Sequence, residues 1–275
     1  MNVLFIGDIF GRPGRDLVRD GLSAIVDRYS IDFVIANAEN AAGGFGITRE
    51  IGDELLDLGV DVMTSGNHIW DKKEALDYIG AEPRLLRPAN YPAGVPGRGA
   101  YVGRTPDGRP VAVLNLMGRV FMPNIDDPFA AALREIDALQ PRPRIIVVDF
   151  HAEATSEKLA MGWHLDGRVT AVFGTHTHVQ TADEQLLPGG TAYITDTGMT
   201  GPHDGIIGVD REAALSRFLT AMPARFDPAT GNPRLHAVVL QADETTGRAH
   251  AIVRLSLTAE QLREWRTTAA AEPAR

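Results

Sequence analysis

Carboxylate, amide and imidazole side chains stand in this sequence at positions where they could bind metal ions. They directly follow short apolar runs, which we interpret as buried strands, in five separate segments of the chain. The residues concerned are Asp8, Glu39, Asn40, Asn67, His68, His151, His176 and His178. Open α/β sheets place their sites at the carboxyl ends of strands, so we expect these side chains to meet at one edge.

Taken singly, most of these residues have an ordinary structural explanation. Asp8 alone is typical of a turn or a helix cap, Asn67 of a turn, and His151 of a buried, hydrogen-bonded histidine. The segment His176-Thr177-His178 is more informative, because side chains at i and i+2 of an extended chain point to the same side. Two converging imidazoles would repel one another when protonated and would need hydrogen-bond partners when neutral, so a metal ion between them and an ordinary structural role both remain open for this pair alone.

The combined set predicts a centre for two metal ions. Two carboxylates, two amides and three imidazoles suffice as oxygen and nitrogen ligands for a pair of hard or borderline cations. Glu39 is the candidate bridge, because a carboxylate has two oxygens. Glu39 and Asn40 would point opposite ways in a regular strand, so we expect them on an irregular turn, which Gly43 and Gly44 allow.

The composition of the 275-residue chain excludes several other chemistries. It has no cysteine, which excludes disulfides, zinc–thiolate sites, iron–sulfur clusters and thiol nucleophiles. With 27 Lys and Arg against 36 Asp and Glu, the net charge is −9. This argues against duplex DNA or an anionic membrane as partner, but not against a small phosphate ester held by metal cations.

The amino-terminal segment predicts a cytoplasmic protein. Its apolar run stops at Asp8 and no basic region precedes it, which is unlike a signal peptide. No stretch approaches the ~18 apolar residues of a membrane span. We therefore expect no membrane partner. Self-association is compatible with the sequence.

Short apolar runs alternate with helical patterns along the first two-thirds of the chain, which predicts a mainly parallel sheet covered by helices. The expected strands are 3–6, 33–36, 60–63, 100–104, 111–117, 144–149, 169–173, 192–195, 235–241 and 249–257. The expected helices are 17–29, 49–58, 72–79, 129–139 and 258–266. No repeat or linker divides the chain, so we expect one domain over residues 1–275, with two facing sheets and helices outside.

Several strings of the sequence resemble the calcineurin-like metallophosphoesterases. They are the Asp8 segment, Gly66-Asn67-His68, the lone His151, and Gly174-Thr175-His176-Thr177-His178. More narrowly, the strings at 7–15, 37–44, 66–70, 149–155 and 189–196 resemble the YmdB-like branch, which are bacterial metal-dependent 2′,3′-cyclic nucleotide phosphodiesterases. The resemblance implies an α/β fold of the α-β-β-α type, a sandwich of two mixed β-sheets flanked by helices.

The chain departs from the broad superfamily at three positions that the YmdB-like branch shares. Phe10 stands where a ligand histidine is usual, Glu39 replaces the bridging aspartate, and Thr175 separates Gly174 from His176. In that branch an asparagine takes the place of the missing imidazole, which here is Asn40. The resemblance thus implies one metal on Asp8, Glu39, Asn40 and His178, and a second on Glu39, Asn67, His151 and His176. It implies iron or manganese, and zinc is compatible with the same ligands.

The resemblance also implies hydrolysis of a small phosphodiester, with a 2′,3′-cyclic nucleotide as the favoured substrate. A hydroxide between the two cations would attack phosphorus. His68 is beside Asn67 but is not a ligand in this scheme, and it would stabilise charge and protonate the leaving oxygen. The alternatives are a phosphomonoester or 3′,5′-cyclic nucleotide as substrate, and a regulatory protein that senses a nucleotide without turning it over.

Other polar residues have no assigned role at this stage. We expect the remaining histidines to be ordinary surface or core residues: His164, His203, His236 and His250. Three acids could orient the ligand imidazoles, namely Asp149, Glu153 and Asp183, and equally they could be solvated.

Overall fold

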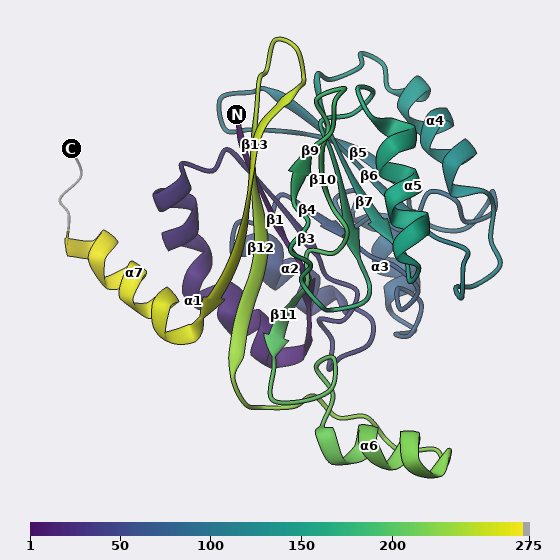
Figure 1. Cartoon of the computed structure of the whole chain (residues 1–275), viewed down its shortest axis with the longest axis vertical. Helices are drawn as coiled ribbons and strands as arrows, with labels where there is room; N and C mark the ends of the chain where they lie inside the picture. Colours follow the sequence, from purple (N-terminus) through teal and green to yellow (C-terminus); the bar gives the residue numbers. More distant parts are fainter. Residues whose placement is uncertain (272–275) are drawn as a thin grey trace.

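Two mixed β-sheets stack face to face in the computed structural model, which describes residues 1–271 (Figure 1). The first sheet has the spatial order β2 (Asp8–Ile9), β11 (Met199–Pro202), β12 (Pro233–Ala242), β1 (Asn2–Ile6), β3 (Phe33–Asn37) and β4 (Val62–Thr64), with β13 (Ala249–Thr258) paired along β12. The second has the order β5 (Ala100–Arg104), β6 (Pro110–Met117), β7 (Ile145–His151), β8 (Ala171–Thr175), β10 (Ala192–Ile194) and β9 (Gln185–Leu186).

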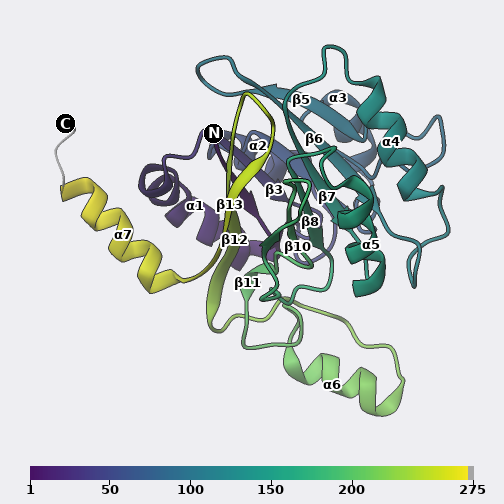
Figure 2. The ribbon, with the colours of Figure 1, turned by 45° about the horizontal axis from the view of Figure 1, so that its top comes forward.

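Helices cover the outer faces of both sheets. Those that pack outside the first sheet are α1 (Gly11–Tyr29), α2 (Arg49–Asp57), α3 (Ala75–Ala81) and α7 (Ala259–Ala271), and those outside the second are α4 (Pro128–Ala138) and α5 (Thr155–Leu165). A further helix, α6 (Arg211–Thr220), projects from the body beyond β11 (Figure 2). Within the described residues, no helix is both long and apolar enough to cross a membrane.

The layers follow from alternation along the strands, because successive side chains of a strand point to opposite faces. In β1, Leu4 and Ile6 join the core under α1, whereas Val3 and Phe5 join the core between the sheets. In β7, Ile145 and Val147 face the first sheet, whereas Ile146, Val148 and Phe150 face α4 and α5. The predicted sandwich of two mixed sheets flanked by helices is confirmed.

Parallel pairing brings the carboxyl ends of the central strands to one edge. In the first sheet β1 pairs in parallel with β3, and β3 with β4. In the second, β6, β7, β8 and β10 are all parallel to their neighbours in that order. The segments that follow these strands therefore meet along one side of the sandwich.

The structure differs from the sequence expectations mainly at element ends. Helix α1 begins at Gly11 and not near Leu17, because Pro13 lies in its first turn, where a backbone N–H has no helical partner. Strand β4 begins at Val62, because Val60 still closes the end of α2 by donating its N–H to Leu55 O at 3.1 Å. Helices α5 and α6 and the short strands β2, β9 and β11 are additions to the elements expected from the sequence.

Candidate metal centre

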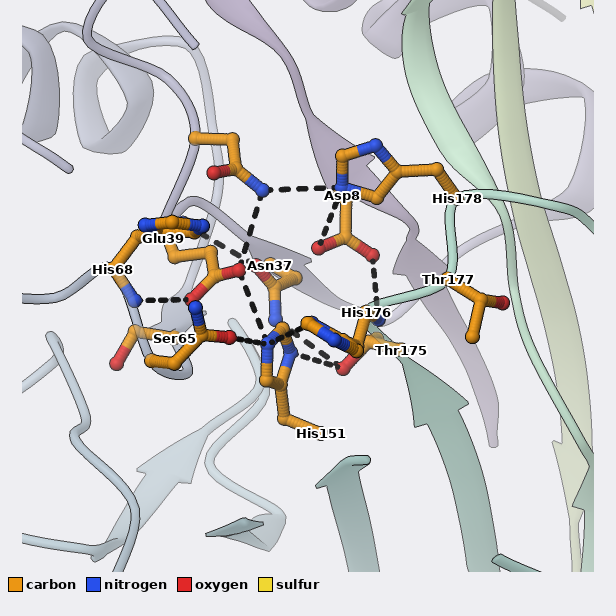
Figure 3. Close-up of polar contacts among 12 residues, drawn as sticks. Asp8, Asn37, Glu39, Ser65, His68, His151, Thr175, His176, Thr177 and His178 are labelled. Atoms are coloured by element: carbon orange, nitrogen blue, oxygen red, sulfur yellow. Dashed lines mark hydrogen bonds and ion pairs between the residues drawn. The ribbon is translucent and has the colours of Figure 1, made fainter. Parts of the chain in front are cut away.

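Seven of the eight candidate side chains gather at the shared edge of the two sheets (Figure 3). Four of them are almost fully buried: Asp8, Glu39, Asn40 and His151. Asp8 begins β2, Glu39 and Asn40 follow β3, Asn67 follows β4, His151 is the last residue of β7, and His176 and His178 follow β8. His151 is thus the last residue of its strand, whereas we expected from the sequence that it would follow the strand.

Three atoms with lone pairs surround Nε2 of His151. Glu39 Oε1 lies 3.1 Å away, Asn67 Oδ1 2.9 Å and His176 Nδ1 3.1 Å. One donor atom each from Glu39, His151 and His176 lies within 4.8 Å of the others. The atoms converge from both sheets on one small volume, which is the arrangement that a metal ion requires.

The hydrogen bonds on the far sides of the rings fix which nitrogen carries the proton. Thr175 Oγ1 donates to Asp149 Oδ1 at 2.7 Å, so it accepts the Nδ1–H of His151 at 2.9 Å. In the same way, Nε2–H of His176 faces Glu153 Oε2 at 3.1 Å. Nε2 of His151 and Nδ1 of His176 then face one another and two oxygens, an arrangement that needs a shared proton or a metal cation among them.

The electrostatics of the cluster show the same need for positive charge. Burial disfavours the imidazolium of His151, but the negative charge of Glu39 outweighs it and raises the pKa of His151 to about 9. Burial would raise the pKa of Glu39, and the charge of His151 instead lowers it to about 2. Burial, together with the charge of His151, lowers the pKa of His176 to about 3, so that ring stays neutral.

A second group of donors lies around Asp8. Its Oδ1 is buried and accepts no hydrogen bond from residues 1–271, although His178 Nε2 lies 3.7 Å away. His178 donates its Nδ1–H to the carbonyl of Ile207 at 2.8 Å, which leaves a lone pair on Nε2. Burial raises the pKa of the Asp8 carboxyl. An orphaned carboxylate oxygen beside an imidazole lone pair fits a second cation.

Asn40 joins the two groups of donors. Its Nδ2 donates to Glu39 Oε1 at 3.2 Å and contacts His178 Nε2 at 3.2 Å. The amide would have to turn over to present its oxygen to a metal ion. The structure therefore brings Asn40 to the predicted place but with its nitrogen facing the centre.

His68 lies beside the cluster and contacts it through its backbone. Its backbone N–H donates to Glu39 Oε2 at 3.1 Å, while its Nδ1 binds Asp71 Oδ2 at 2.8 Å. Phe45 packs edge to face on the ring at 5.0 Å between centroids. The side chain keeps 29% of its surface exposed. His68 is thus anchored at the rim, where a bound molecule can reach it.

The comparison with known families decides what the chain is. A family model described as "YmdB-like protein" matches residues 4–255. The chain belongs to the YmdB-like family. The predicted family membership is therefore confirmed.

Relatives of this YmdB-like chain span nearly its whole length. A Bacillus subtilis protein named 2′,3′-cyclic-nucleotide 2′-phosphodiesterase is 52% identical over 93% of this chain and 96% of its own. A crystal structure of a hypothetical protein from Thermus thermophilus has a TM-score of 0.88 at 45% identity, covering 94% and 99% of the two chains. A Mycoplasma pneumoniae protein described as a novel phosphatase has a TM-score of 0.86 at 32% identity, covering 96% of each. Two of these names are those of phosphoric ester hydrolases.

The loop that carries His176 and His178 is not the extended chain that the sequence analysis expected. Both histidines have left-handed backbone angles, with φ of 100° and 66°. Between them, Thr177 donates its N–H and its hydroxyl to Asp196 Oδ2 at 3.1 and 2.8 Å. The same oxygen binds Nζ of the buried Lys158 at 2.7 Å. In this YmdB-like chain, the buried pair Lys158–Asp196 holds the loop in its strained shape.

The structure gives different contacts to the three acids whose roles the sequence left open. Glu153 binds the His176 ring directly, whereas Asp149 acts on His151 through the hydroxyl of Thr175. Asp183 instead accepts the backbone N–H of Thr195 at 3.1 Å, away from the imidazoles. Sequence reasoning missed Lys158 and Asp196, because neither stands next to a candidate residue in the chain.

Two of the remaining histidines form a pair, contrary to the expectation that they lack convergent partners. The rings of His203 and His236 meet edge to face at 4.6 Å, and His236 is 8% exposed. Burial, with the adjacent His203, lowers the pKa of His236 to about 3.

This lowered pKa predicts a loss of stability in acid. In the unfolded chain His236 is protonated below about pH 6.5, whereas in the folded chain it stays neutral down to about pH 3. The free energy of unfolding therefore falls as the pH falls through that window. We expect this effect of His236 to lower the free energy of unfolding by about 2 kcal/mol between pH 7 and pH 4.5. Urea unfolding of chelator-treated protein should show a shallower pH dependence for His236→Gln, and an unchanged one for the exposed His250→Gln. Equal slopes for His236→Gln and the native chain would contradict this.

Proposed function

We propose that this chain is a metal-dependent phosphodiesterase that opens 2′,3′-cyclic nucleotides. The observation that carries the proposal is the convergence of Glu39 Oε1, Asn67 Oδ1 and His176 Nδ1 on Nε2 of His151, all within 3.1 Å. The substrate class comes from the name of the Bacillus subtilis relative, which is 52% identical.

Two cations would share the cluster in this proposal. One would be held by Asp8, Glu39, Asn40 and His178, and the other by Glu39, Asn67, His151 and His176. The orphaned Asp8 Oδ1 and the lone pairs of the imidazoles fit such a pair. Oxygen and nitrogen ligands suit iron or manganese, and they accept zinc. When bound, the cations would supply a water molecule activated at neutral pH and would neutralise charge on the phosphate.

His68 is the proposed catalytic residue. Asp71 accepts its Nδ1–H, which fixes the ring and leaves Nε2 without a hydrogen bond within residues 1–271. Phe45 prevents the ring from turning freely. From this position, Nε2 would hold a proton for the departing ribose oxygen and donate it as the P–O bond breaks.

A broader phosphatase is the second candidate function. It is favoured by the Mycoplasma pneumoniae structure, which is described as a phosphatase and matches 96% of this chain. A regulatory protein that only senses a nucleotide is less well supported, because such a protein needs no leaving-group acid.

A substrate panel distinguishes these functions. Protein supplied with Mn²⁺ or Fe²⁺ is assayed with 2′,3′-cAMP, 3′,5′-cAMP and p-nitrophenyl phosphate, with chelator-treated protein as the control. We expect turnover to be fastest with 2′,3′-cAMP and to disappear on chelation. Faster release of p-nitrophenol would favour the phosphatase, and binding of 2′,3′-cAMP without any product would favour the sensor.

Gly66 offers a test of the proposed centre that does not touch a ligand. A Cβ at Gly66 would lie 2.1 Å from Cδ2 and 2.2 Å from Nε2 of His151, so Gly66→Ala must displace that ring. We expect about 1–3 kcal/mol of destabilisation and a loss of bound metal, measured by thermal unfolding and elemental analysis.

Gly80→Ala is the matched control, because a Cβ at Gly80 meets no atom within 4 Å and the residue lies in helix α3. That variant should keep its metal and its stability. A Gly66→Ala protein with native metal content would show that the imidazole of His151 is not a ligand.

A further inference from the structure

Four arginines line a cavity of about 270 Å³ that has no part in the proposed reaction. Arg142 and Arg144 precede β7, Arg168 precedes β8, and Arg248 precedes β13. The metal centre takes its histidines from the other ends of β7 and β8. A seven-residue strand is about 20 Å long, so the cavity and the centre lie on opposite ends of the second sheet.

None of these four guanidinium groups has a carboxylate partner within residues 1–271. Arg142 donates to the carbonyl of Arg168 at 2.7 Å, and Arg248 donates to the carbonyl of Pro188 at 3.3 Å. The side chains of Arg144 and Arg168 make no hydrogen bond or ion pair at all in that part of the chain. Four unneutralised positive charges around one cavity are unexpected in a chain of net charge −9.

The acids nearest to the cavity in the sequence are already engaged. Asp166 accepts the N–H of Gly189 at 2.7 Å, and Asp243 accepts the N–H of Thr245 at 2.7 Å. Glu244 pairs with Arg109 and with the chain's amino terminus. Asp166 and Asp243 keep their negative charge in these hydrogen bonds, but within residues 1–271 neither forms an ion pair with an arginine of the cavity.

Glycines shape the rest of the cavity wall. Four of them line it, namely Gly167, Gly189, Gly190 and Gly247, so little side-chain bulk separates a ligand from the backbone. At Gly190, Nε of Arg248 lies 2.6 Å from where a Cβ would stand. The absence of a side chain at Gly190 thus leaves room for the Arg248 guanidinium.

We propose that this cavity binds a small anion that carries at least two phosphate groups, such as the diphosphate part of a nucleotide. Planar guanidinium groups bind phosphate oxygens in pairs, and arginine keeps its charge at every physiological pH. Four arginines from three strand ends line this one cavity, which matches a ligand with several negative charges. The inference does not depend on the proposed function, because it uses none of the residues of the metal centre.

Calorimetry with inorganic pyrophosphate tests the proposal. Chelator-treated protein is used, so that pyrophosphate cannot bind through metal ions. We expect binding that weakens at least tenfold in Arg144→Gln/Arg168→Gln, the pair of arginines without other partners. The control is Arg98→Gln/Arg104→Gln, which removes the same charge from exposed arginines outside the cavity and should bind as the native chain does.

Two results would overturn the proposal. One is an absence of pyrophosphate binding by the native chain at millimolar concentration, or equal affinity in the cavity variant. The other is binding of a single-stranded RNA oligomer that depends on Arg144 and Arg168 while pyrophosphate does not bind, which would make the cavity part of a nucleic-acid surface. Because all four arginine substitutions alter exposed side chains, thermal unfolding should confirm that each protein is folded.

Discussion

If the proposed function holds, replacing His68 with alanine should leave both metal ions bound and lower turnover of 2′,3′-cAMP by about 10²–10⁴-fold. This is the contribution that a positioned general acid typically makes. The metal ions stay because the ring of His68 binds Asp71 and not the cluster, and its contact with Glu39 is made by the backbone N–H, which alanine retains. Elemental analysis and steady-state kinetics on the same sample measure both effects.

A matched substitution separates this role from a general loss of imidazole. His164→Ala removes an exposed ring that packs on Phe129 in the outer layer, and we expect native kinetics from it. If the His68→Ala protein instead loses metal, then His68 is a ligand and the assigned set is wrong. If it keeps both its metal and its full rate, another group must protonate the leaving oxygen.

Replacing Lys158 with methionine should destabilise the protein by about 3–5 kcal/mol and weaken metal binding as well. The substitution leaves Asp196 as a buried carboxylate without its cation, in a pair whose side chains are 1% and 0% exposed. Thr177 depends on that carboxylate, so the histidines on either side of it lose their fixed backbone. Chemical unfolding and a metal titration report the two effects separately.

The double variant Lys158→Met/Asp196→Asn is the control for this prediction. It removes both charges, so most of the unfolding free energy should return, whereas metal affinity should stay low because an amide has one acceptor oxygen. A Lys158→Met protein that is less stable but binds metal with native affinity would limit the pair to a structural role. It would then have no part in positioning His176 and His178.

The sequence predicted the strands and their common edge well, because both depend on local patterns. Strand β1 appears as a short apolar run followed by a carboxylate, and β4 and β7 appear as apolar runs that lead to Asn67 and His151. Parallel pairing then brings the strand ends together without further information. The seven metal-centre candidates could therefore be named before their distances were known.

What the sequence could not predict depends on contacts between distant segments. Helix α5 places Glu157 and Lys158 on its buried side, so no apolar period marks it. The left-handed backbone at His176 and His178 results from hydrogen bonds to Asp196, some twenty residues further along. The unpaired Arg144 and Arg168 could not be recognised either, since a sequence does not show which arginines lack partners.

The bond between Glu39 and His151 crosses from one sheet to the other, between residues far apart in the sequence. During synthesis, a growing chain that ends after β4 lacks the three candidate imidazole ligands, and its β1 has not yet paired with β12, which is near the other end of the chain. Tight capture of a cation must then come after the last strands have docked. Retained metal would in that case indicate that all the strands of both sheets have folded together. A chelator would then weaken the contact between the two sheets.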